Sequence, residues 1–177
     1  MSDQNIPTWL KESTYEKLFL QGEAAQILSR PGIKAELLHV LTMHDVEPKL
    51  RVLAHELLIE AGQPLHPSLA EAYCQALPDG FLHNWWGMPG QYLERLGRTM
   101  VAFGQAAIPC LTTLLGNQQP LHYIGSEEPT LSHAMHYRVC DLAAYLIAAI
   151  TGIPYNDAQQ PETRDKFIAE LQRRAGP

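Results

Sequence analysis

The chain has 177 residues, of which 46% are hydrophobic and 18% are charged, so it can bury a sizeable core and is not a disordered sequence. Its net charge of −6 argues against a general nucleic-acid binder, because such proteins usually carry a basic stripe that neutralises phosphates. The first residues predict no secretory signal, and the longest apolar run, residues 142–153, is about half the roughly 20 residues that a membrane-spanning helix needs.

The three cysteines are well separated and form no Cys-x-x-Cys pair: they are Cys74, Cys110 and Cys140. This pattern is typical of buried free thiols in a reducing compartment. It predicts a cytoplasmic protein, and no part of the sequence indicates a cofactor.

Helix patterns recur along the chain, whereas runs that alternate apolar and polar residues beside a hairpin turn are nearly absent. After an N-terminal arm of residues 1–12, Ser13 or Thr14 can cap the first helix, which ends before Pro31 and Gly32. The patterns predict helices over residues 15–30, 33–43, 46–62, 66–77, 91–104, 106–117, 132–151 and 162–175.

Two long connections interrupt these helices, an aromatic loop at residues 78–90 and an insertion at residues 117–130. The chain is predicted to form a single domain, residues 1–177. After the N-terminal arm, the two connections separate a first hairpin block at residues 13–77 from a second block at residues 91–153, which contains the insertion. A linker and a capping helix follow at residues 154–177. Loops of this length inside a compact domain are often functional.

Pairs of these predicted helices share one form, a short helix, a turn, a basic residue, an apolar helix and a glycine. Arg51-Val52 and Arg138-Val139 take equivalent places, separated by about twice the period of roughly 40–47 residues expected for HEAT units. The pattern resembles the HEAT or armadillo-like α-solenoid family in the segments 33–62 and 92–153. The residues that match the family's pattern are Ala107, Pro109, Leu111, Leu114, Leu115, Arg138, Asp141 and Leu146.

The resemblance implies an all-α fold, a right-handed stack of about three to four antiparallel helix hairpins. A helix hairpin cannot bury its apolar face alone, so neighbouring hairpins must cover it. The helix after Arg138 is therefore expected to place Val139, Leu142 and Leu146 against the leucines of the preceding helix. Asp141 is expected to stabilise the start of its helix or to pair with an arginine of a neighbouring repeat. The family has no catalytic signature.

A cluster of histidines and a cysteine offers an alternative, a metal site. If residues 132–151 form one helix, then His133, His136 and Cys140 share a face, and His122 from the preceding loop could add a fourth ligand for zinc. The spacing matches no standard zinc signature, and a cysteine on an apolar helix is usually a core residue. The other histidines, His39, His44 and His55, are expected to be surface or internally bonded residues.

The two long connections carry the predicted partner-contact residues, because tryptophan and tyrosine dominate the energetics of protein interfaces. These residues are Phe81, Trp85, Trp86, Met88, Tyr123, Ile124, Glu127 and Glu128. The opposing interpretation is that Trp85 and Trp86 fill the junction between repeat blocks. Two adjacent rings seldom both point inward from a loop. We therefore expect one of the two tryptophans to lie in the core and the other to be available to a partner.

Together these patterns favour a non-catalytic protein-binding scaffold or adaptor, and they also allow a small inhibitor or immunity-type protein that masks a basic toxin. The acidic charge favours a basic protein as partner, rather than nucleic acid or membrane. The alternative functions are a metal-binding protein or metalloenzyme that uses His133, His136 and Cys140, and a helical-repeat base-excision or lyase-like enzyme, to which the acidic charge is unfavourable. The sequence does not predict the oligomeric state.

Overall fold

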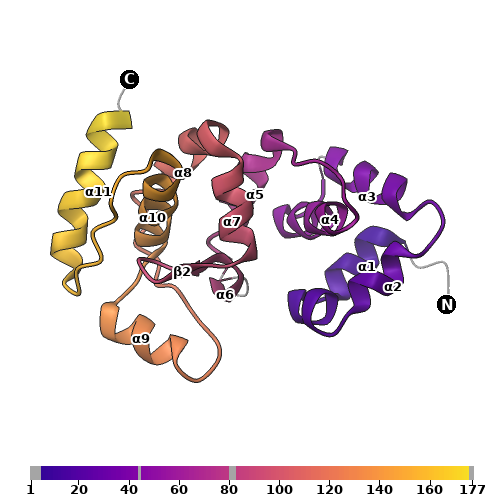
Figure 1. The fold of residues 1–177 in the computed structure, drawn as a ribbon, viewed down its shortest axis with the longest axis horizontal. Helices are drawn as coiled ribbons and strands as arrows, with labels where there is room; N and C mark the ends of the chain where they lie inside the picture. The colour runs from indigo at the N-terminus through magenta and orange to yellow at the C-terminus, as the bar shows by residue number, and fades with distance from the viewer. Residues whose placement is uncertain (1–4, 44, 80–82, 176–177) are drawn as a thin grey trace. The chain divides into compact units, whose positions relative to one another are not determined.

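The computed structural model describes residues 5–43, 45–79 and 83–175 and confirms the predicted all-α class (Figure 1). The chain forms two compact units, Met1–Tyr73 and Cys74–Pro177, and the boundary falls within one short helix. None of the helices in the described part of the chain combines the length and the apolar character that a membrane crossing requires.

Unit 1 contains the predicted helix hairpin of residues 33–62. Its two helices, α3 and α4, pack against each other, and their buried leucines and valines form the centre of the unit. α4 starts with Pro48, whose missing N–H costs nothing in the first turn. The elements are α1 (Ile6–Glu12), η1 (Glu16–Leu20), α2 (Glu23–Leu28), α3 (Ile33–Thr42), α4 (Pro48–Glu60), η2 (Pro67–Leu69) and the first part of α5 (Ala70–Ala76).

Two expectations for unit 1 are corrected. Residues 15–30 do not form one helix, because Gly22 has a φ of 82°, a left-handed conformation that glycine adopts readily and that separates η1 from α2. The predicted N-terminal arm includes α1, whose Ile6 and Leu10 side chains are buried.

A buried polar chain crosses the interior of unit 1. The backbone N–H of His66 donates to Nε2 of His55 over 3.2 Å, and the hydroxyl of Tyr73 donates to Oε1 of Glu56 over 2.7 Å. Nδ1 of His55 therefore donates to the Tyr73 oxygen, 2.9 Å away, and His55 is neutral. Burial, together with the charge of His66, lowers the pKa of His55 to about 4.

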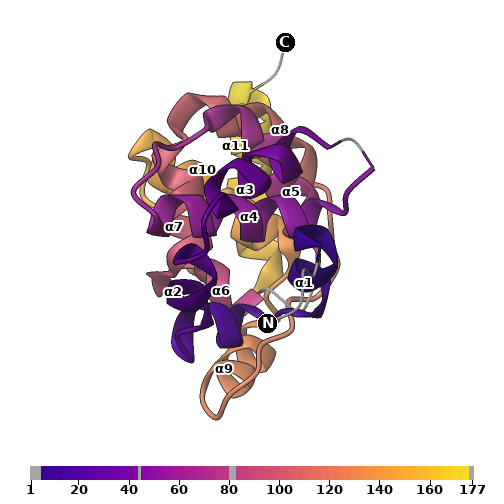
Figure 2. The same ribbon diagram turned by 90° about the vertical axis from the view of Figure 1, so that its right-hand side faces the viewer.

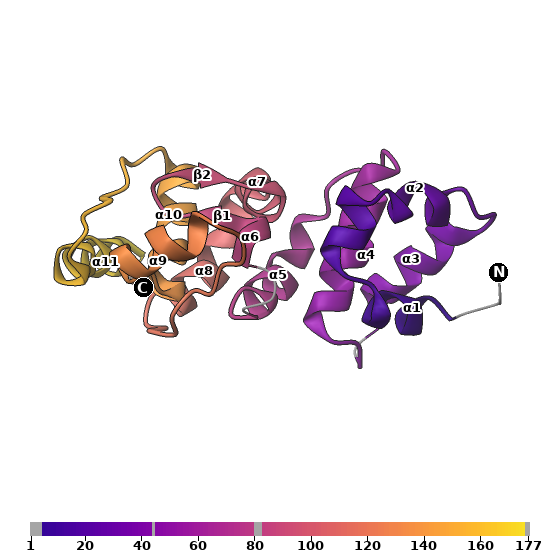
Figure 3. The same cartoon turned by 90° about the horizontal axis from the view of Figure 1, so that it is seen from below.

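Unit 2 is built around α10, the helix that the sequence marks as too apolar to be exposed. α10 contacts α7, α8 and α11, and Figures 1 and 3 show it between α7 and α11. Its Val139, Leu142 and Leu146 side chains are fully buried, and its packing on α8 agrees with the expected pairing of these helices. The elements are α6 (His83–Trp86), β1 (Gly87–Met88), β2 (Tyr92–Leu93), α7 (Arg95–Ala102), η4 (Gly104–Ala107), α8 (Ile108–Leu114), α9 (Glu128–Met135), α10 (Val139–Thr151) and α11 (Pro161–Ala175).

Both predicted loops contain regular structure. In the segment 78–90, α6 leads into the two-residue strand β1, which pairs with β2 in an antiparallel hairpin that joins Gly87 to Leu93 and Met88 to Tyr92. The end of the segment 117–130 begins α9. The predicted helix 132–151 is in fact two helices, because His136 adopts a left-handed conformation with a φ of 51° and ends α9.

The expectation of three free thiols is wrong for two of the cysteines. Cys74 in α5 and Cys110 in α8 form a disulfide, with their Cα atoms 6.0 Å apart, a separation typical of such bonds. Cys140 is free and buried in α10. The cysteine pattern therefore no longer supports a reducing compartment, and the predicted location stays a prediction.

Candidate functional site

The part of unit 2 that differs most from a packed helical core is the segment of residues 124–135, which we call the α9 arm. It consists of a short loop and α9. Figures 1 and 2 show α9 standing apart from α7, α8, α10 and α11. Both ends of the arm are fixed to the rest of unit 2 by hydrogen bonds, so its base is held while its surface stays accessible.

At its first end, the arm is fixed by α6 and by the β1–β2 hairpin. Asn84 makes a two-way bond to the backbone of Ile124: its Nδ2 donates to the Ile124 carbonyl over 2.7 Å, and its Oδ1 accepts from the Ile124 N–H over 2.8 Å. The hydroxyl of Tyr123 donates to the carbonyl of Gly87 over 2.9 Å. The Ile124 side chain is nevertheless 69% exposed, so a fixed backbone presents an apolar side chain to solvent.

His83 adds a buried anchor next to this point. Its Nδ1 accepts the backbone N–H of His122 over 2.7 Å, and its Nε2 lies 3.2 Å from the Leu77 carbonyl, which can only accept. The ring is therefore neutral with its proton on Nε2. Burial lowers the pKa of His83 and outweighs its contacts with the backbone carbonyls of His122 and Leu77. His83 thus acts as a structural link and has no ring nitrogen left for a ligand.

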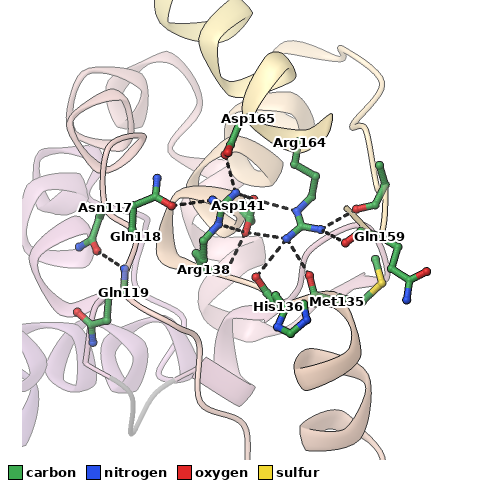
Figure 4. A network of polar contacts seen from close by, with 11 residues as sticks. Asn117, Gln118, Gln119, Met135, His136, Arg138, Asp141, Gln159, Arg164 and Asp165 are labelled. Carbon is green, nitrogen blue, oxygen red and sulfur yellow. Dashed lines mark hydrogen bonds and ion pairs between the residues drawn. The ribbon is translucent and has the colours of Figure 1, made fainter. Parts of the chain in front are cut away.

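At its second end, the arm is fixed by Arg164, a fully buried residue in the first turn of α11 (Figure 4). Nη2 of Arg164 donates to the carbonyls of Met135 and His136 over 2.8 and 3.2 Å, where α9 ends. Nη1 donates to the carbonyls of Ala158 and Gln159 over 2.6 and 3.0 Å. One guanidinium therefore joins α11, the end of the α9 arm and the connection that precedes α11.

The counter-charge of Arg164 is Asp141, in the first turn of α10, which is also fully buried. Oδ1 of Asp141 accepts from Nε of Arg164 over 3.0 Å, and Oδ2 accepts the backbone N–H of Arg138 over 2.9 Å, which caps the helix. Arg138 also pairs with Asp141 through its guanidinium and extends to Asp165 over 2.7 Å and Gln118 over 2.6 Å (Figure 4).

The ionisation of this cluster follows from its hydrogen bonds. Burial alone would raise the pKa of Asp141, but the bonds from Arg138 and Arg164 outweigh it and hold that pKa below its usual value. The bonds to Asp141 raise the pKa of the Arg138 guanidinium. The expected role of Asp141 at the start of its helix is observed, and Asp141 also pairs with Arg164 of α11. That its arginine partner belongs to a neighbouring repeat stays a prediction.

A second contact ties the connection before α11 to the hairpin. The Tyr137 hydroxyl donates to Oδ1 of Asp157 over 2.6 Å, and Nε2 of Gln91 donates to Oδ2 over 2.7 Å. Gly90, with a φ of 73°, lies so close that a Cβ atom there would be 2.4 Å from Cγ of Asp157. The Arg164 guanidinium also stacks on the Tyr137 ring, 5.2 Å from its centroid.

The predicted partner-contact residues divide between core and surface. Trp86, Met88 and Tyr123 are buried, which corrects the expectation that they are available to a partner. The remaining predicted residues have different surroundings: Trp85 and Glu128 are half-buried, Ile124 and Glu127 are exposed, and Phe81 lies outside the described residues. Of the two adjacent tryptophans, Trp86 fills the core and Trp85 reaches the surface.

The alternative metal site does not form. Because α9 ends before His136 and α10 begins at Val139, His133, His136 and Cys140 do not share one helix face. Burial raises the pKa of the Cys140 thiol to about 11, which disfavours the thiolate that zinc binds. Within residues 5–43, 45–79 and 83–175, no three histidine, cysteine, aspartate or glutamate side chains come together to hold a metal ion.

Two surface pockets flank the α9 arm. The first, about 600 Å³, lies between the arm and the start of α10, and His122, His133, His136 and Tyr137 are among its lining residues. The second, about 520 Å³, lies between the arm and the β1–β2 hairpin and is lined in part by Tyr92, Glu127, Glu128 and Leu131. The arm therefore presents a different surface on each of its sides.

Sequence reasoning missed the residues that anchor the arm. Arg164 had a signal: it lies on the same face of its helix as Ile168 and Leu171, and an arginine on an apolar face indicates a buried, paired charge. For His83 and Asn84 the sequence offers no such signal, because their partners are backbone groups far along the chain.

Comparisons of the chain with protein-family models, with curated proteins and with solved structures find no match.

Proposed function

We propose that this protein is a non-catalytic protein-binding module and that the α9 arm is its contact surface. The observation that carries the proposal is the exposure of apolar side chains on an arm whose two ends are fixed. Ile124 is 69% exposed and Leu131 is 38% exposed, while hydrogen bonds from Asn84 and Arg164 hold the ends of the arm. Pre-organisation of this kind lowers the entropy cost of binding.

The polar residues at the base of the arm support a structural rather than a chemical role for that region. Every nitrogen of the Arg164 guanidinium donates to an acceptor within the chain, and both ring nitrogens of His83 bond to the backbone. Groups that are saturated in this way hold the arm in position and are not available to a substrate.

The arrangement as a short HEAT-like solenoid belongs to the same proposal. Two contacts support it: α3 packs against α4 and α8 packs against α10, and repeats of this family are built from packed helix pairs. In solenoids, insertions between repeat helices lie on one face and often form the binding surface. The α9 arm, inserted between α8 and α10, fits that role.

Affinity capture from the native source tests the proposal. The variants are Leu131→Asp and Ile124→Asp, and the matched control is Leu20→Asp, because Leu20 in unit 1 is a large apolar side chain that is 66% exposed. We expect a specific partner to be retained by the native protein and by the control. The arm variants should retain at least about tenfold less of that partner, because a charge in the centre of an interface raises the dissociation rate of the complex.

Circular dichroism checks that all three variants stay folded, as we expect for substitutions at exposed positions. Retention of the same partners by Leu131→Asp and Ile124→Asp at native levels would show that the arm is not the contact surface. Equal loss from Leu20→Asp would show the same, because the effect would then be non-specific.

A further inference from the structure

The groove between the α9 arm and the β1–β2 hairpin combines an apolar wall with acidic groups. We use "the acidic groove" for this pocket of about 520 Å³, whose lining includes Met88, Tyr92, Glu127, Glu128, Leu131 and Ala134. Leu131 and Ala134 lie on α9, and Met88 and Tyr92 lie on the hairpin.

The two glutamates of the acidic groove differ from Glu94 and Glu170, which form ion pairs on the surface of unit 2. Neither Glu127 nor Glu128 has an ion-pair partner in the part of the chain that the structure describes. By contrast, Glu94 pairs with Arg98 over 3.4 Å, and Glu170 pairs with Arg174 over 2.9 Å. Both glutamates also lie at the start of α9, where the helix favours a negative charge.

Tyr92 places an aromatic ring beside this charge. Its side chain is half-buried in the groove wall, and burial raises the pKa of its hydroxyl, with Glu128 and Glu94 adding to the effect. An aromatic ring next to two carboxylates is a favourable environment for a guanidinium or an ammonium group, which gains from the ring face and from the charges together.

We propose that the acidic groove binds a basic segment of a partner protein, in which an arginine or lysine lies against Tyr92 and pairs with Glu127 and Glu128 while a neighbouring apolar side chain contacts Leu131. This inference rests on the proposed function and adds the chemistry of the partner. The carboxylates repel nucleic acid, and the apolar surface of Leu131 and Ala134 gives a peptide side chain a contact that a simple polyamine lacks.

The test uses the full chain and NMR titration of its backbone amides. The probe is the acetylated peptide Gly-Leu-Arg-Leu-Arg-Gly, and the comparison probes are the peptide with glutamates in place of arginines, the peptide with serines in place of leucines, and spermidine. We expect the arginine–leucine peptide to shift the amides of Tyr92, Leu131 and Ala134, and each comparison probe to bind more weakly.

Two pairs of variants separate this site from the general acidic charge of the chain. The double variant Glu127→Gln/Glu128→Gln should weaken binding of the arginine–leucine peptide about five- to tenfold, from the loss of two charge pairs at the protein surface. The control Glu23→Gln/Glu162→Gln also removes two charges, each from the first turn of another helix, and should leave binding unchanged. The charge reversal Glu127→Lys/Glu128→Lys should transfer the preference to the glutamate peptide.

Equal binding of the arginine and glutamate peptides, equal binding of spermidine, or shifts outside the acidic groove would overturn the proposal. If those results occur while Leu131→Asp still loses the native partner, the protein-binding function stands and the basic chemistry is wrong. If Leu131→Asp keeps the native partner, the function itself is wrong.

Discussion

Replacement of Asp141 by asparagine tests the network that fixes the α9 arm. The substitution keeps the size of the side chain and leaves an oxygen that can still accept the backbone N–H of Arg138. It removes the carboxylate that pairs with Arg164, and both side chains of that pair are fully buried. Breaking a buried ion pair by removing one partner costs about 3–5 kcal/mol, because the remaining charge is left without compensation. We expect Asp141→Asn to lower the free energy of unfolding of unit 2 by about 3 kcal/mol.

Urea denaturation followed by far-UV circular dichroism measures this change. The control is Asp165→Asn, because Asp165 pairs with Arg138 but is 48% exposed, and its loss should cost less than about 1 kcal/mol. The double variant Asp141→Asn/Arg164→Met removes both buried charges and should be more stable than the sum of the two single variants predicts. If Asp141→Asn costs no more than Asp165→Asn, the buried pair does not hold the arm in the way we describe.

Two further predictions concern single contacts. The pKa of His55 is about 4 in the folded chain and 6.5 in the unfolded chain, so unfolding takes up a proton below pH 6.5 and stability falls as the pH falls. The free energy of unfolding of unit 1 should fall by about 2 kcal/mol between pH 7.5 and pH 5 in urea titrations. The variant His55→Gln keeps an acceptor for the His66 N–H and should flatten this pH dependence. An unchanged pH dependence in the variant would refute the assignment to His55. Gly90→Ala should destabilise unit 2 by at least about 2 kcal/mol in thermal unfolding, because the backbone is left-handed and the new Cβ meets Asp157. Gly104→Ala, at a φ of 61° with open space around it, should cost only the conformational part, and equal losses at both positions would contradict the contact.

The helical class and the apolar faces were predictable from the sequence, because periodic leucines and valines identify a buried stripe without knowledge of its partner. The packing of α8 on α10 follows from this pattern. The break at His136 was not predictable, since histidine seldom adopts a left-handed conformation, and here the carbonyl of His136 is held by Arg164 from another helix. Local spacing therefore placed His133 and Cys140 on a helix face that does not exist.

The candidate site was predictable only in its chain position. The segment 117–130 was marked as a functional insertion, and Ile124, Glu127 and Glu128 within it do reach the surface. Composition could not separate these residues from Tyr123, which turns inward to bond to a backbone carbonyl. Which side of a loop faces the core depends on long-range hydrogen bonds, such as those of Asn84, and a single sequence does not encode them in a readable pattern.

Site-specific photo-crosslinking in cells tests the central claim most directly. A photoreactive amino acid is placed at Leu131 on the α9 arm and, as a control, at Leu20 in unit 1, two exposed positions of the same residue type. We expect a discrete crosslinked product to one protein from position 131 and none from position 20. Crosslinks from both positions alike, or none from position 131, would contradict the claim that the α9 arm is a partner-binding surface.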